Sequence, residues 1–470
     1  MVDRLSTQDT SFLSLEDGLT PMHVGQVLIC QQPPNKLGSD AIVAKIGARL
    51  DALPRYRQRV RYVPGWLANP VWVDDDNFEL DYHVRRSALP SPGSDEQLSE
   101  FVARVSARPL DLSRPLWEVY VVEDLQRDRF AVITKTHQSL VDTAHALDIA
   151  GILLDEGVHE DNETPTSWTP RPAPNGASLM ADAVLDNLRR PGQVIDTVRS
   201  GFGDLRETGR RALRVGGTVL RASASPAHDS PFQAPVGTAR RFVMVSSDLA
   251  DYREVRRALG DADAVTSVTV NDVALATITG ALRNWHQMRG DHVRTGASVR
   301  AMVPVTVADE HEPSGRRVQA AFVDLPIGEN SPGMRLRQIS FAMRQQMEVG
   351  KAVGADTLAG LSGFAPPAMH SLGARLGSAM TRRLFNLVIT NVPGPQRVLY
   401  AGEAPLVATY PVMPLARGQA LAIGMTSYNG KIYYGINADR DALPDVDLLG
   451  EALAEALEEL LESGAAGNVR

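Results

Sequence analysis

Two mostly apolar segments, Trp117–Glu123 and Phe130–Thr136, lie close together in the chain and are separated by the polar turn Gln126–Asp128. Both are rich in β-branched and aromatic residues, and short runs of this kind between turn residues are typical of buried strands. Consecutive strands joined by a short turn usually lie side by side. The sequence therefore predicts a fold built around a sheet in which these two strands are neighbours.

The same region predicts further strands and helices in alternation. Met22–Cys30 has the composition of a strand, whereas Asp40–Leu53 and Ser94–Ala107 carry apolar residues at helical spacing and end before a proline. Helical spacing resumes at Thr143–Leu154. This alternation indicates an α/β protein, and we expect residues 1–157 to form a first globular domain.

The second half of the chain, residues 237–470, has a similar content and is expected to form a second domain. Asn271–Gln287 is the strongest helix prediction, because its apolar residues recur near the helical period. Asn429–Gly430 predicts a tight hairpin between two strands. The other expected elements are the strands Arg241–Ser246, Val299–Val307, Arg317–Pro326, Asn386–Val392, Ala420–Tyr428 and Lys431–Asn437 and the helix Asp445–Ser463.

A connector of residues 158–236 separates the two expected domains. Val158–Ala177 is rich in proline and has no apolar period, which predicts a loop, and Ala224–Pro235 is a second loop. Ser178–Ala222, between them, is amphipathic and rich in arginine. This segment allows two interpretations: a solvated helical connector, or an attachment to anionic lipid with its apolar residues in the interface.

The composition excludes several classes of protein. The 470 residues are 43% hydrophobic and 22% charged, which allows a large core, and the net charge of -8 does not favour a nucleic-acid partner. Cys30 is the only cysteine, so neither an internal disulfide nor a cysteine cluster for zinc can form. Charged residues interrupt the start of the chain, and no run approaches the ~20 apolar residues of a spanning helix. We therefore expect a cytoplasmic protein that lies at most on a membrane surface.

The predicted strand Phe130–Thr136 is followed by a segment that resembles an active-site motif. Residues 137–143 read His-Gln-Ser-Leu-Val-Asp-Thr. They resemble the acyl-transfer motif His-His-x-x-x-Asp-Gly, in which the second His takes a proton from an acceptor hydroxyl. Gln138 stands at the position of that His, and Thr143 at the position of the Gly. An imidazole accepts a proton near neutral pH, whereas a carboxamide does not.

Further blocks accompany this motif along the chain. They are Leu5–Leu13, Thr20–Gly25, Pro70–Asp75, Asp81–Arg85, Ser113–Glu118, Val270–Val273, Asn391–Pro395 and Ser427–Gly430. In their order and spacing they resemble the bacterial wax ester synthase/diacylglycerol acyltransferase family of mycobacterial type. The resemblance covers nearly the whole chain, and it is the combination of blocks that is specific.

The resemblance implies an α/β fold with mixed sheets, made of two chloramphenicol acetyltransferase-like domains with a tunnel between them. One side of the tunnel would admit acyl-CoA and the other a lipid alcohol. The implied reaction transfers a long-chain fatty acyl group from acyl-CoA to diacylglycerol or to a fatty alcohol. Acyl-CoA is then a co-substrate, and neither a cofactor nor a metal is expected. Such substrates make a membrane or a lipid droplet a possible partner surface.

The resemblance also marks candidate catalytic residues, which are His137, Gln138 and Asp142. Asp142 is expected to hold the site together through a buried ion pair, and Thr143, counted with the substrate-binding residues, lacks the backbone freedom of a glycine. Neighbouring residues of a strand point to opposite faces. If Gln138 faces the tunnel, we therefore expect His137 to be a hydrogen-bonded core histidine, unless a bulge turns it inward. His145 is expected either on a helix surface or at the tunnel mouth.

Five residues of the second half are expected to bind substrate. Asn271 and Asp272 open the strongest predicted helix, where they would cap the helix, line the tunnel, or do both. Asn391, Pro393 and Gly394 belong to a turn that ends a strand. The resemblance places this turn near the coenzyme site.

Two functions follow from these observations. Loss of a general base typically lowers a rate by about 10²–10⁴. Gln138 therefore predicts either a weak O-acyltransferase or a non-catalytic protein that binds acyl-lipid or acyl-CoA and retains the tunnel. Acyl-chain length, the acceptor and the oligomeric state stay open at the level of sequence.

Overall fold

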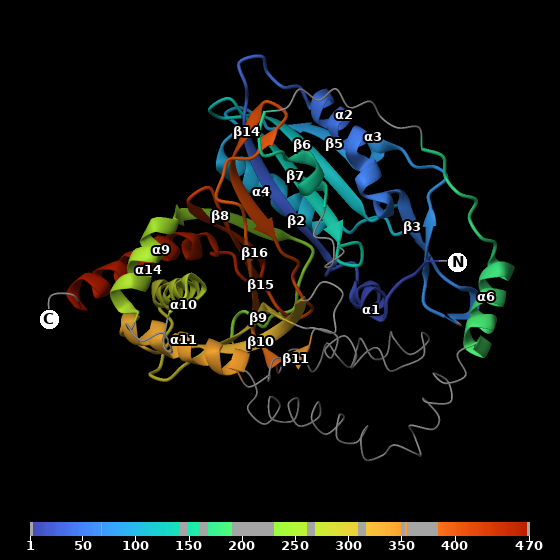
Figure 1. Ribbon diagram of the computed structural model, residues 1–470. Coiled ribbons are helices and arrows are strands. Elements are labelled where there is room, and N and C mark those ends of the chain that lie inside the picture. Colours follow the sequence, from blue (N-terminus) through green and yellow to red (C-terminus); the bar gives the residue numbers. More distant parts are fainter. Residues whose placement is uncertain are drawn as a thin grey trace, which may run out of the picture.

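The computed structural model describes residues 3–66, 68–141, 148–158, 168–189, 230–260, 268–308, 316–348, 353–354 and 384–467. These residues form two large mixed sheets and one small sheet, with helices packed against them (Figure 1). The predicted α/β class with mixed sheets is confirmed. The two ends of the chain lie on opposite sides of the molecule (Figure 1).

The first large sheet contains the two strands that the sequence predicts most clearly. Its strands are β2 (His23–Gln31), β5 (Val84–Ala88), β6 (Trp117–Leu125), β7 (Arg129–His137), β13 (Tyr400–Ala401) and β14 (Ala404–Val412). They lie in the order β13-β14-β2-β7-β6-β5, and β6 and β7 pair as expected. Alternate residues of β2, β6 and β7 enter two different apolar clusters, so the sheet is covered on both faces.

The second large sheet has seven strands. They are β8 (Arg240–Asp248), β9 (Val299–Ala308), β10 (Arg316–Leu325), β11 (Val353–Gly354), β12 (Leu387–Pro393), β15 (Leu421–Tyr428) and β16 (Lys431–Asp439). Their order is β11-β10-β9-β12-β15-β16-β8, and β12 is parallel to both of its neighbours. The predicted hairpin is confirmed, since Asn429 and Gly430 both have positive φ (44° and 81°), as its tight turn requires.

The helices of the first half lie beside its large sheet, except the last one, which packs on the small sheet. They are α1 (Thr7–Leu15), α2 (Ser39–Arg49), α3 (Leu80–His83), α4 (Asp95–Ala107), α5 (Ile149–Leu153) and α6 (Gly176–Arg189), with 3₁₀ turns at Leu50–Ala52, Pro54–Arg57 and Pro64–Trp66. The small sheet consists of β1 (Asp3–Arg4), β3 (Gln58–Arg61) and β4 (Val71–Asp74). Capping boxes start α1 at Ser6 and α4 at Ser94, because each serine bonds the backbone three residues on.

Two predicted helices differ from the observed ones. The helix expected over Asp40–Leu53 ends at Arg49 and continues as a 3₁₀ turn. Of the helix expected over Thr143–Leu154, the described part is α5, because residues 142–147 lie outside the described residues. The arginine-rich segment begins in α6, and its remainder from residue 190 also lies outside them.

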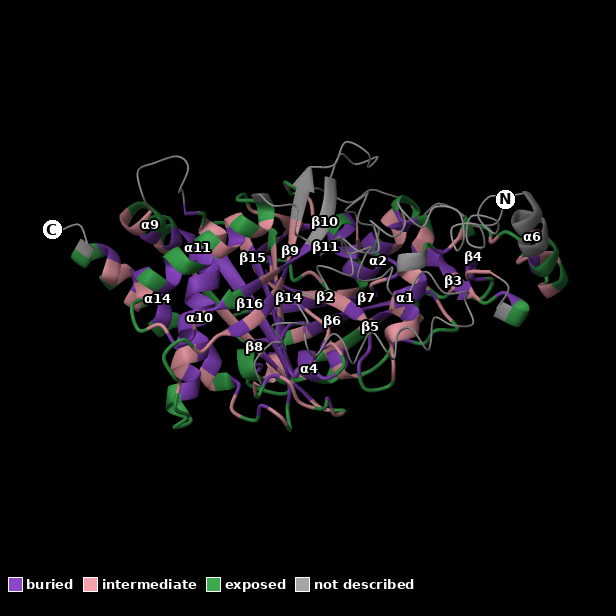
Figure 2. Ribbon diagram, turned by 90° about the horizontal axis from the view of Figure 1, so that it is seen from below, coloured by how far each residue is buried: buried purple, intermediate pink, exposed green. Residues whose placement is uncertain are grey.

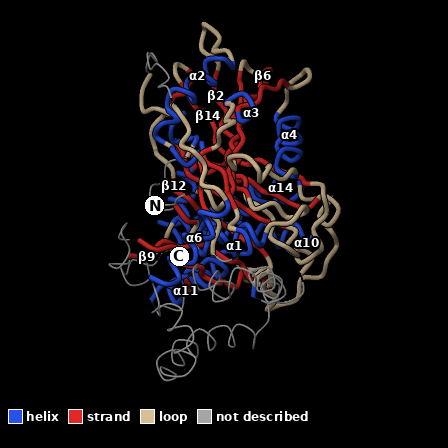
Figure 3. Tube along the Cα trace, turned by 90° about the vertical axis from the view of Figure 1, so that its right-hand side faces the viewer, coloured by secondary structure: helices blue, strands red, loops and turns tan. Residues whose placement is uncertain are grey.

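The helices of the second half cover its sheet. They are α9 (Leu249–Leu259), α10 (Val270–Met288), α11 (Pro332–Glu348) and α14 (Asp447–Gly467). α10 is buried on nearly all sides, as its colour in Figure 2 shows, because α14 and α11 pack beside it. Figure 3 shows α10 and α14 on one side of the molecule, away from α2 and α3. Within the described part of the chain, we find no helix with the length and apolar character needed to cross a bilayer.

One segment of the second half belongs to the sheet of the first. β14 pairs with β2, and β13 pairs with β14, although both follow β12 in the chain. Tyr433 and Tyr428 of the second sheet donate hydrogen bonds to the backbone carbonyls of Val407 and Leu406. The two domain ranges remain a prediction; the large sheets follow them except at residues 400–412, which tie the halves together.

β14, the strand that joins the sheet of the first half, packs against two glycines of the second sheet. Gly424 and Gly435 face each other across β15 and β16, and Pro411 of β14 fits over them. A Cβ on Gly435 would lie 1.9 Å from the backbone oxygen of Pro411. A backbone atom cannot move aside as a flexible side chain can, so these glycines set how closely the halves approach.

We expect Gly435→Ala to lower the free energy of unfolding by about 1–3 kcal/mol, because the added methyl group overpacks this crossing. Urea denaturation of the purified protein measures the change. Gly18→Ala is the matched control, since a Cβ there meets no atom within 4 Å. Equal stability of the two variants would show that β14 does not pack on β16 in this way.

Candidate active site

The imidazole of His137, the last residue of β7, is fully buried. Its Nδ1 lies 2.6 Å from Oγ of Ser139, and the backbone N–H of Ser139 donates to the same nitrogen at 3.1 Å. On the other side of the ring, Nε2 lies 3.1 Å from Oε2 of Glu16. Because Nδ1 accepts a backbone hydrogen bond, a neutral ring carries its proton on Nε2, which forms no hydrogen bond with Glu16 or with any other described residue. The prediction of a buried, hydrogen-bonded His137 is confirmed.

Glu16 is positioned by the end of α1. It is the C-cap residue of that helix, and its backbone N–H donates to the carbonyl of Phe12. The side chain is only 7% exposed, and neither carboxylate oxygen has a hydrogen-bond partner among the described residues. An isolated carboxylate is costly to bury. Nε2 of His137 lies 3.1 Å from one carboxylate oxygen, and the charge of Lys135 also interacts with Glu16. Glu16 has no sequence signal, since nothing in the chain indicates which residue faces His137.

Gln138 lies outside this buried group. Its side chain is half-buried, and its backbone N–H donates to the carbonyl of Met22 at 2.9 Å. Among the described residues, the carboxamide of Gln138 has no hydrogen-bond partner. The predicted roles of Asp142, Thr143 and His145 remain predictions, because these residues lie outside the described part of the chain.

Two further ionisable groups lie next to His137 in the sheet. His23 faces it across β2 and β7, and burial followed by the charge of Lys135 lowers the pKa of His23 well below its usual value. Lys135 is itself buried, and its Nζ donates to the carbonyl of Arg108 and lies 3.6 Å from a carboxylate oxygen of Glu118. Burial lowers the pKa of Lys135 to about 8, although Glu118 opposes the shift. His23 is therefore neutral beside His137 at physiological pH.

The lowered pKa of Lys135 predicts a pH dependence of stability. From about pH 8 up to the ordinary value of 10.5, the unfolded chain keeps a proton that the folded protein releases, so the free energy of unfolding rises with pH. We expect the free energy of unfolding of wild type, minus that of Lys135→Met, to increase with pH over this range. Below this range the difference should not change with pH. Urea denaturation at several pH values measures it, with Lys431→Met, half exposed, as control. A difference that does not change with pH would contradict the burial of a titrating Lys135.

A pocket of about 330 Å³ lies in the second half, between α9, α10, β12 and β15. It brings together four predicted substrate-binding residues: Asn271, Asn391, Pro393 and Gly394. Nδ2 of Asn391 donates to Oδ1 of Asn271 at 2.9 Å, which joins the end of β12 to the start of α10. The other lining residues are Leu249, Arg253, Val270, Ala274, Gln396, Met425, Ser427 and Ile432.

The lining combines apolar surface with uncharged hydrogen-bonding groups. Arg253 is the only ionisable residue among the described residues that form it. Such a lining suits a ligand with amide groups and an aliphatic chain. Ser427 and Gln396 lie in or next to blocks that the sequence marks, whereas nothing in the sequence indicates Arg253. None of the residues around His137 lines this pocket.

Asp272 has a different position from the other predicted binding residues. The helix cap is Thr269, two residues before the predicted start, and Asp272 is the third helical residue. Its carboxylate accepts from the backbone N–H of Thr269 at 2.9 Å, while Thr269 Oγ1 accepts from the N–H of Asp272. Asp272 is buried and does not line the pocket. The capping interpretation is correct for Asp272, with the cap residue shifted to Thr269.

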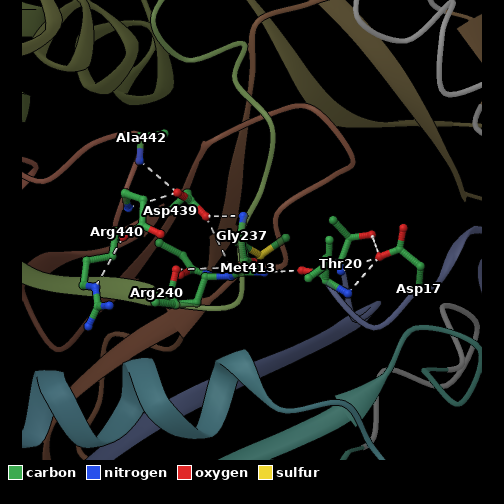
Figure 4. A network of polar contacts seen from close by, with 12 residues as sticks. Asp17, Thr20, Gly237, Arg240, Met413, Asp439, Arg440 and Ala442 are labelled. Atoms are coloured by element: carbon green, nitrogen blue, oxygen red, sulfur yellow. Dashed lines mark hydrogen bonds and ion pairs between the residues drawn. The ribbon is translucent and has the colours of Figure 1, made fainter.

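A buried ion pair of the second half holds an arginine that also contacts the first half (Figure 4). Arg240 at the start of β8 lies 3.6 Å from Asp439 at the end of β16, and both side chains are almost fully buried. Arg240 also donates to the carbonyl of Leu19, in the loop between α1 and β2. Asp17 holds that loop by accepting from Thr20. The segment that leads into β2, and so toward His137, is thus anchored on the second half.

The model of the wax ester synthase/diacylglycerol acyltransferase catalytic domain matches residues 5–274, and that of the family's C-terminal domain matches residues 314–461. The chain belongs to the wax ester synthase/diacylglycerol acyltransferase family.

One relative extends over nearly the whole chain, and another over more than half of it. A probable diacylglycerol O-acyltransferase of Mycobacterium tuberculosis, tgs1, is 30% identical over 98% of this chain and 96% of its own length. Another, tgs3, is 45% identical over 57% of this chain and 99% of its own length.

Among solved structures, the wax ester synthase/diacylglycerol acyltransferase of Marinobacter aquaeolei VT8 is 28% identical, with a TM-score of 0.68, over 98% of this chain and all of that one. A starter condensation domain of rhizomide synthetase shares the fold at 13% identity, with a TM-score of 0.55, over 99% of this chain and 94% of that one. The predicted two-domain fold of this family is confirmed.

Proposed function

We propose that the protein is an O-acyltransferase that moves a long-chain fatty acyl group from acyl-CoA to diacylglycerol or to a fatty alcohol. The observation that carries the proposal is the family match over both the catalytic and the C-terminal domain. Relatives of nearly the same length are named diacylglycerol O-acyltransferases. Acyl-CoA serves as co-substrate in this proposal, and no cofactor takes part.

The pocket at Asn271 and Asn391 supports the donor side of the proposal. The pantetheine arm of acyl-CoA is a chain with two amide groups, which pair with uncharged donors and acceptors of the kind that line this pocket. The apolar residues Val270, Met425 and Ile432 supply surface for its methylene groups. This assignment gives Asn271 and Asn391 the task of orienting the thioester.

Gln138 decides how fast the reaction proceeds. Its carboxamide N–H groups can donate to the carbonyl oxygen of the thioester, where charge develops in the transition state. The carboxamide cannot take the proton of an acceptor hydroxyl. This favours either slow transfer or the second candidate function, a non-catalytic protein that binds acyl-lipid or acyl-CoA.

An acyl-transfer assay separates the two functions. Purified protein is incubated with long-chain acyl-CoA and either diacylglycerol or a fatty alcohol, and the release of free thiol and the formation of ester are followed. Ester formation above the rate without protein supports the transferase. Binding of acyl-CoA with no ester from either acceptor, in wild type and in Gln138→His, would leave only the binding function.

We also propose a peripheral attachment to membranes or lipid droplets, because the proposed acceptors reside there. Flotation with vesicles that contain anionic lipid tests this at low and at high salt. We expect binding that weakens as salt rises, since basic residues contact anionic head groups. Absence of the protein from the floated fraction at low salt would exclude this attachment.

A further inference from the structure

Arg253 of α9 lines the pocket at Asn271 and Asn391, and it has no part in the proposed binding of the pantetheine arm. It is the only ionisable side chain among the described residues that form the lining. The side chain is exposed, and its guanidinium forms no ion pair or hydrogen bond with the described residues. A guanidinium is not deprotonated in proteins and donates several hydrogen bonds in one plane. Arg253 therefore adds a fixed positive charge to a lining that is otherwise uncharged.

The exposure of the lining residues distinguishes an inner from an outer part of the pocket. The inner part is apolar and buried, and it consists of Leu249, Ala274, Met425 and Ile432. The outer part is exposed and contains Arg253, Pro393 and Gln396. A charged group is costly to place among apolar side chains. A ligand with a neutral arm and an anionic end therefore binds with the arm inside the pocket and the anionic end at Arg253.

The helical spacing of α9 directs Arg253 toward the pocket. Leu249 and Arg253 are four residues apart, so they share one face of the helix, and both line the pocket. Asp251 and Glu254 are three residues apart and share a different face, because residues one or two positions apart on a helix do not face each other. Burial and then the charges of Asp248 and Glu254 raise the pKa of Asp251, as expected where carboxylates lie near one another. The spacing thus places the arginine on the pocket side of α9 and these carboxylates on another side.

The charge of the whole chain makes a cation at this position important for an anionic ligand. The net charge is -8, so the average field of the protein opposes the approach of an anion. An anionic ligand therefore needs a local positive charge at its binding site. The planar guanidinium of an arginine can donate two parallel hydrogen bonds to one phosphate group. Arg253 thus has the chemistry that binds a phosphate.

The size of the pocket indicates which part of CoA it can hold. Its volume of about 330 Å³ is at the lower end of the range of about 300–1,000 Å³ that is typical of pockets for drug-sized ligands. CoA consists of an uncharged pantetheine arm and a nucleotide part that carries all of its phosphates. A pocket of this size suits the arm and leaves the nucleotide part outside. The diphosphate that joins the two parts then lies at the outer end of the pocket, where Arg253 is exposed.

We propose that Arg253 is a specificity-determining residue that binds the diphosphate of CoA at the outer end of this pocket. Through this contact the protein prefers CoA thioesters to thioesters without a phosphate. This inference rests on the proposed function, in which the pocket at Asn271 and Asn391 takes the pantetheine arm of acyl-CoA. It adds the group that recognises the charged part of the donor.

The first test measures the binding of CoA to the full-length protein by isothermal titration calorimetry. We expect Arg253→Met to raise the Kd of CoA by about 5–10-fold, because the charge-assisted hydrogen bonds to the diphosphate are lost. Arg253→Lys keeps the charge without the planar group and should recover part of the affinity. The matched control is Arg337→Met, since Arg337 is an exposed arginine of α11 that does not line the pocket.

The binding test has a result that overturns the inference. If wild type and Arg253→Met bind CoA with the same Kd, or if neither binds it, Arg253 does not recognise the diphosphate. Because Arg253 is exposed, we expect Arg253→Met to keep its fold, and urea denaturation of wild type and variant verifies this.

The second test compares two acyl donors that differ in their phosphates. Palmitoyl-CoA and palmitoyl-pantetheine carry the same thioester and the same arm, but only the first has phosphate groups. We expect Arg253→Met to raise the KM of palmitoyl-CoA by about 5–10-fold and to leave the KM of palmitoyl-pantetheine at its wild-type value. An equal rise for both donors would mean that Arg253 shapes the pocket and does not bind phosphate, which contradicts the inference.

The two tests together separate this inference from the proposed function. If no variant and no wild type forms ester, the proposed acyl transfer fails, and the Kd values of CoA still decide the inference. If wild type forms ester and Arg253→Met has the same KM for palmitoyl-CoA, the inference is wrong and the proposed function stands.

Discussion

We expect Gln138→His to raise the rate of acyl transfer by about 10²–10⁴, the factor that a general base typically contributes. The variant places an imidazole where the family motif has one, on a residue that is half-buried and has no side-chain partner among the described residues. Histidine has nearly the volume of glutamine, and the backbone hydrogen bond from residue 138 to Met22 is unaffected. Thiol release and ester formation measure the gain.

The gain should require a group that accepts protons. Gln138→Asn, which changes the side chain without adding a base, is the matched control and should show no increase. The gain should also fade at acidic pH, where an imidazole is protonated. A wild type that already transfers acyl groups at the rate of Gln138→His would mean that position 138 does not supply the base.

The second large effect is expected from Arg240→Met. This change leaves Asp439 buried beside an apolar side chain and removes the hydrogen bond to Leu19 that ties the halves together. Breaking a buried ion pair by removing one partner costs about 3–5 kcal/mol. Asp439 keeps backbone N–H donors from Gly237, Asp441 and Ala442, so we expect the lower end, about 3 kcal/mol.

The neighbouring residue provides the control. Arg241 pairs with Asp447 at 2.8 Å, but both side chains are largely exposed, so Arg241→Met should change the free energy of unfolding by about 0–1 kcal/mol. Urea denaturation followed by tryptophan fluorescence compares the two variants under the same conditions. If both variants lose the same free energy of unfolding, the buried contacts of Arg240 stabilise the protein no more than the exposed ion pair of Arg241.

Local pattern was sufficient for most elements of the fold. β6, β7, α10 and the hairpin at Asn429 lie where apolar spacing and turn residues predict them. The partner of β14 could not be predicted, because alternation along a strand says nothing about which sheet receives it. The pair Gly424 and Gly435 explains the crossing only once Pro411 is seen above them.

Some residues of the candidate site could be predicted from the sequence, and others could not. The motif marks His137 and Gln138, and the blocks of the second half mark Asn271 and Asn391, which the structure joins by a hydrogen bond across 120 positions of the chain. Glu16 carries no sequence signal, because its proximity to His137 depends on the end of α1 meeting the end of β7. Burial and proximity are properties of packed elements, not of residue types.

By itself, the chain determined the family, many of its strands and helices, and the absence of an ionisable group at position 138, because these depend on residue identity and short-range spacing. It did not indicate α1, β5, α9, α11 or β14. Only the tertiary structure decided that β14 joins the first sheet, that Arg240, buried beside Asp439, bonds Leu19 of the first half, and that Glu16 and Ser139 lie on either side of one imidazole. Those outcomes depend on contacts between residues far apart in the chain. Such contacts stabilise the fold only when the two surfaces that carry them are removed from water against each other.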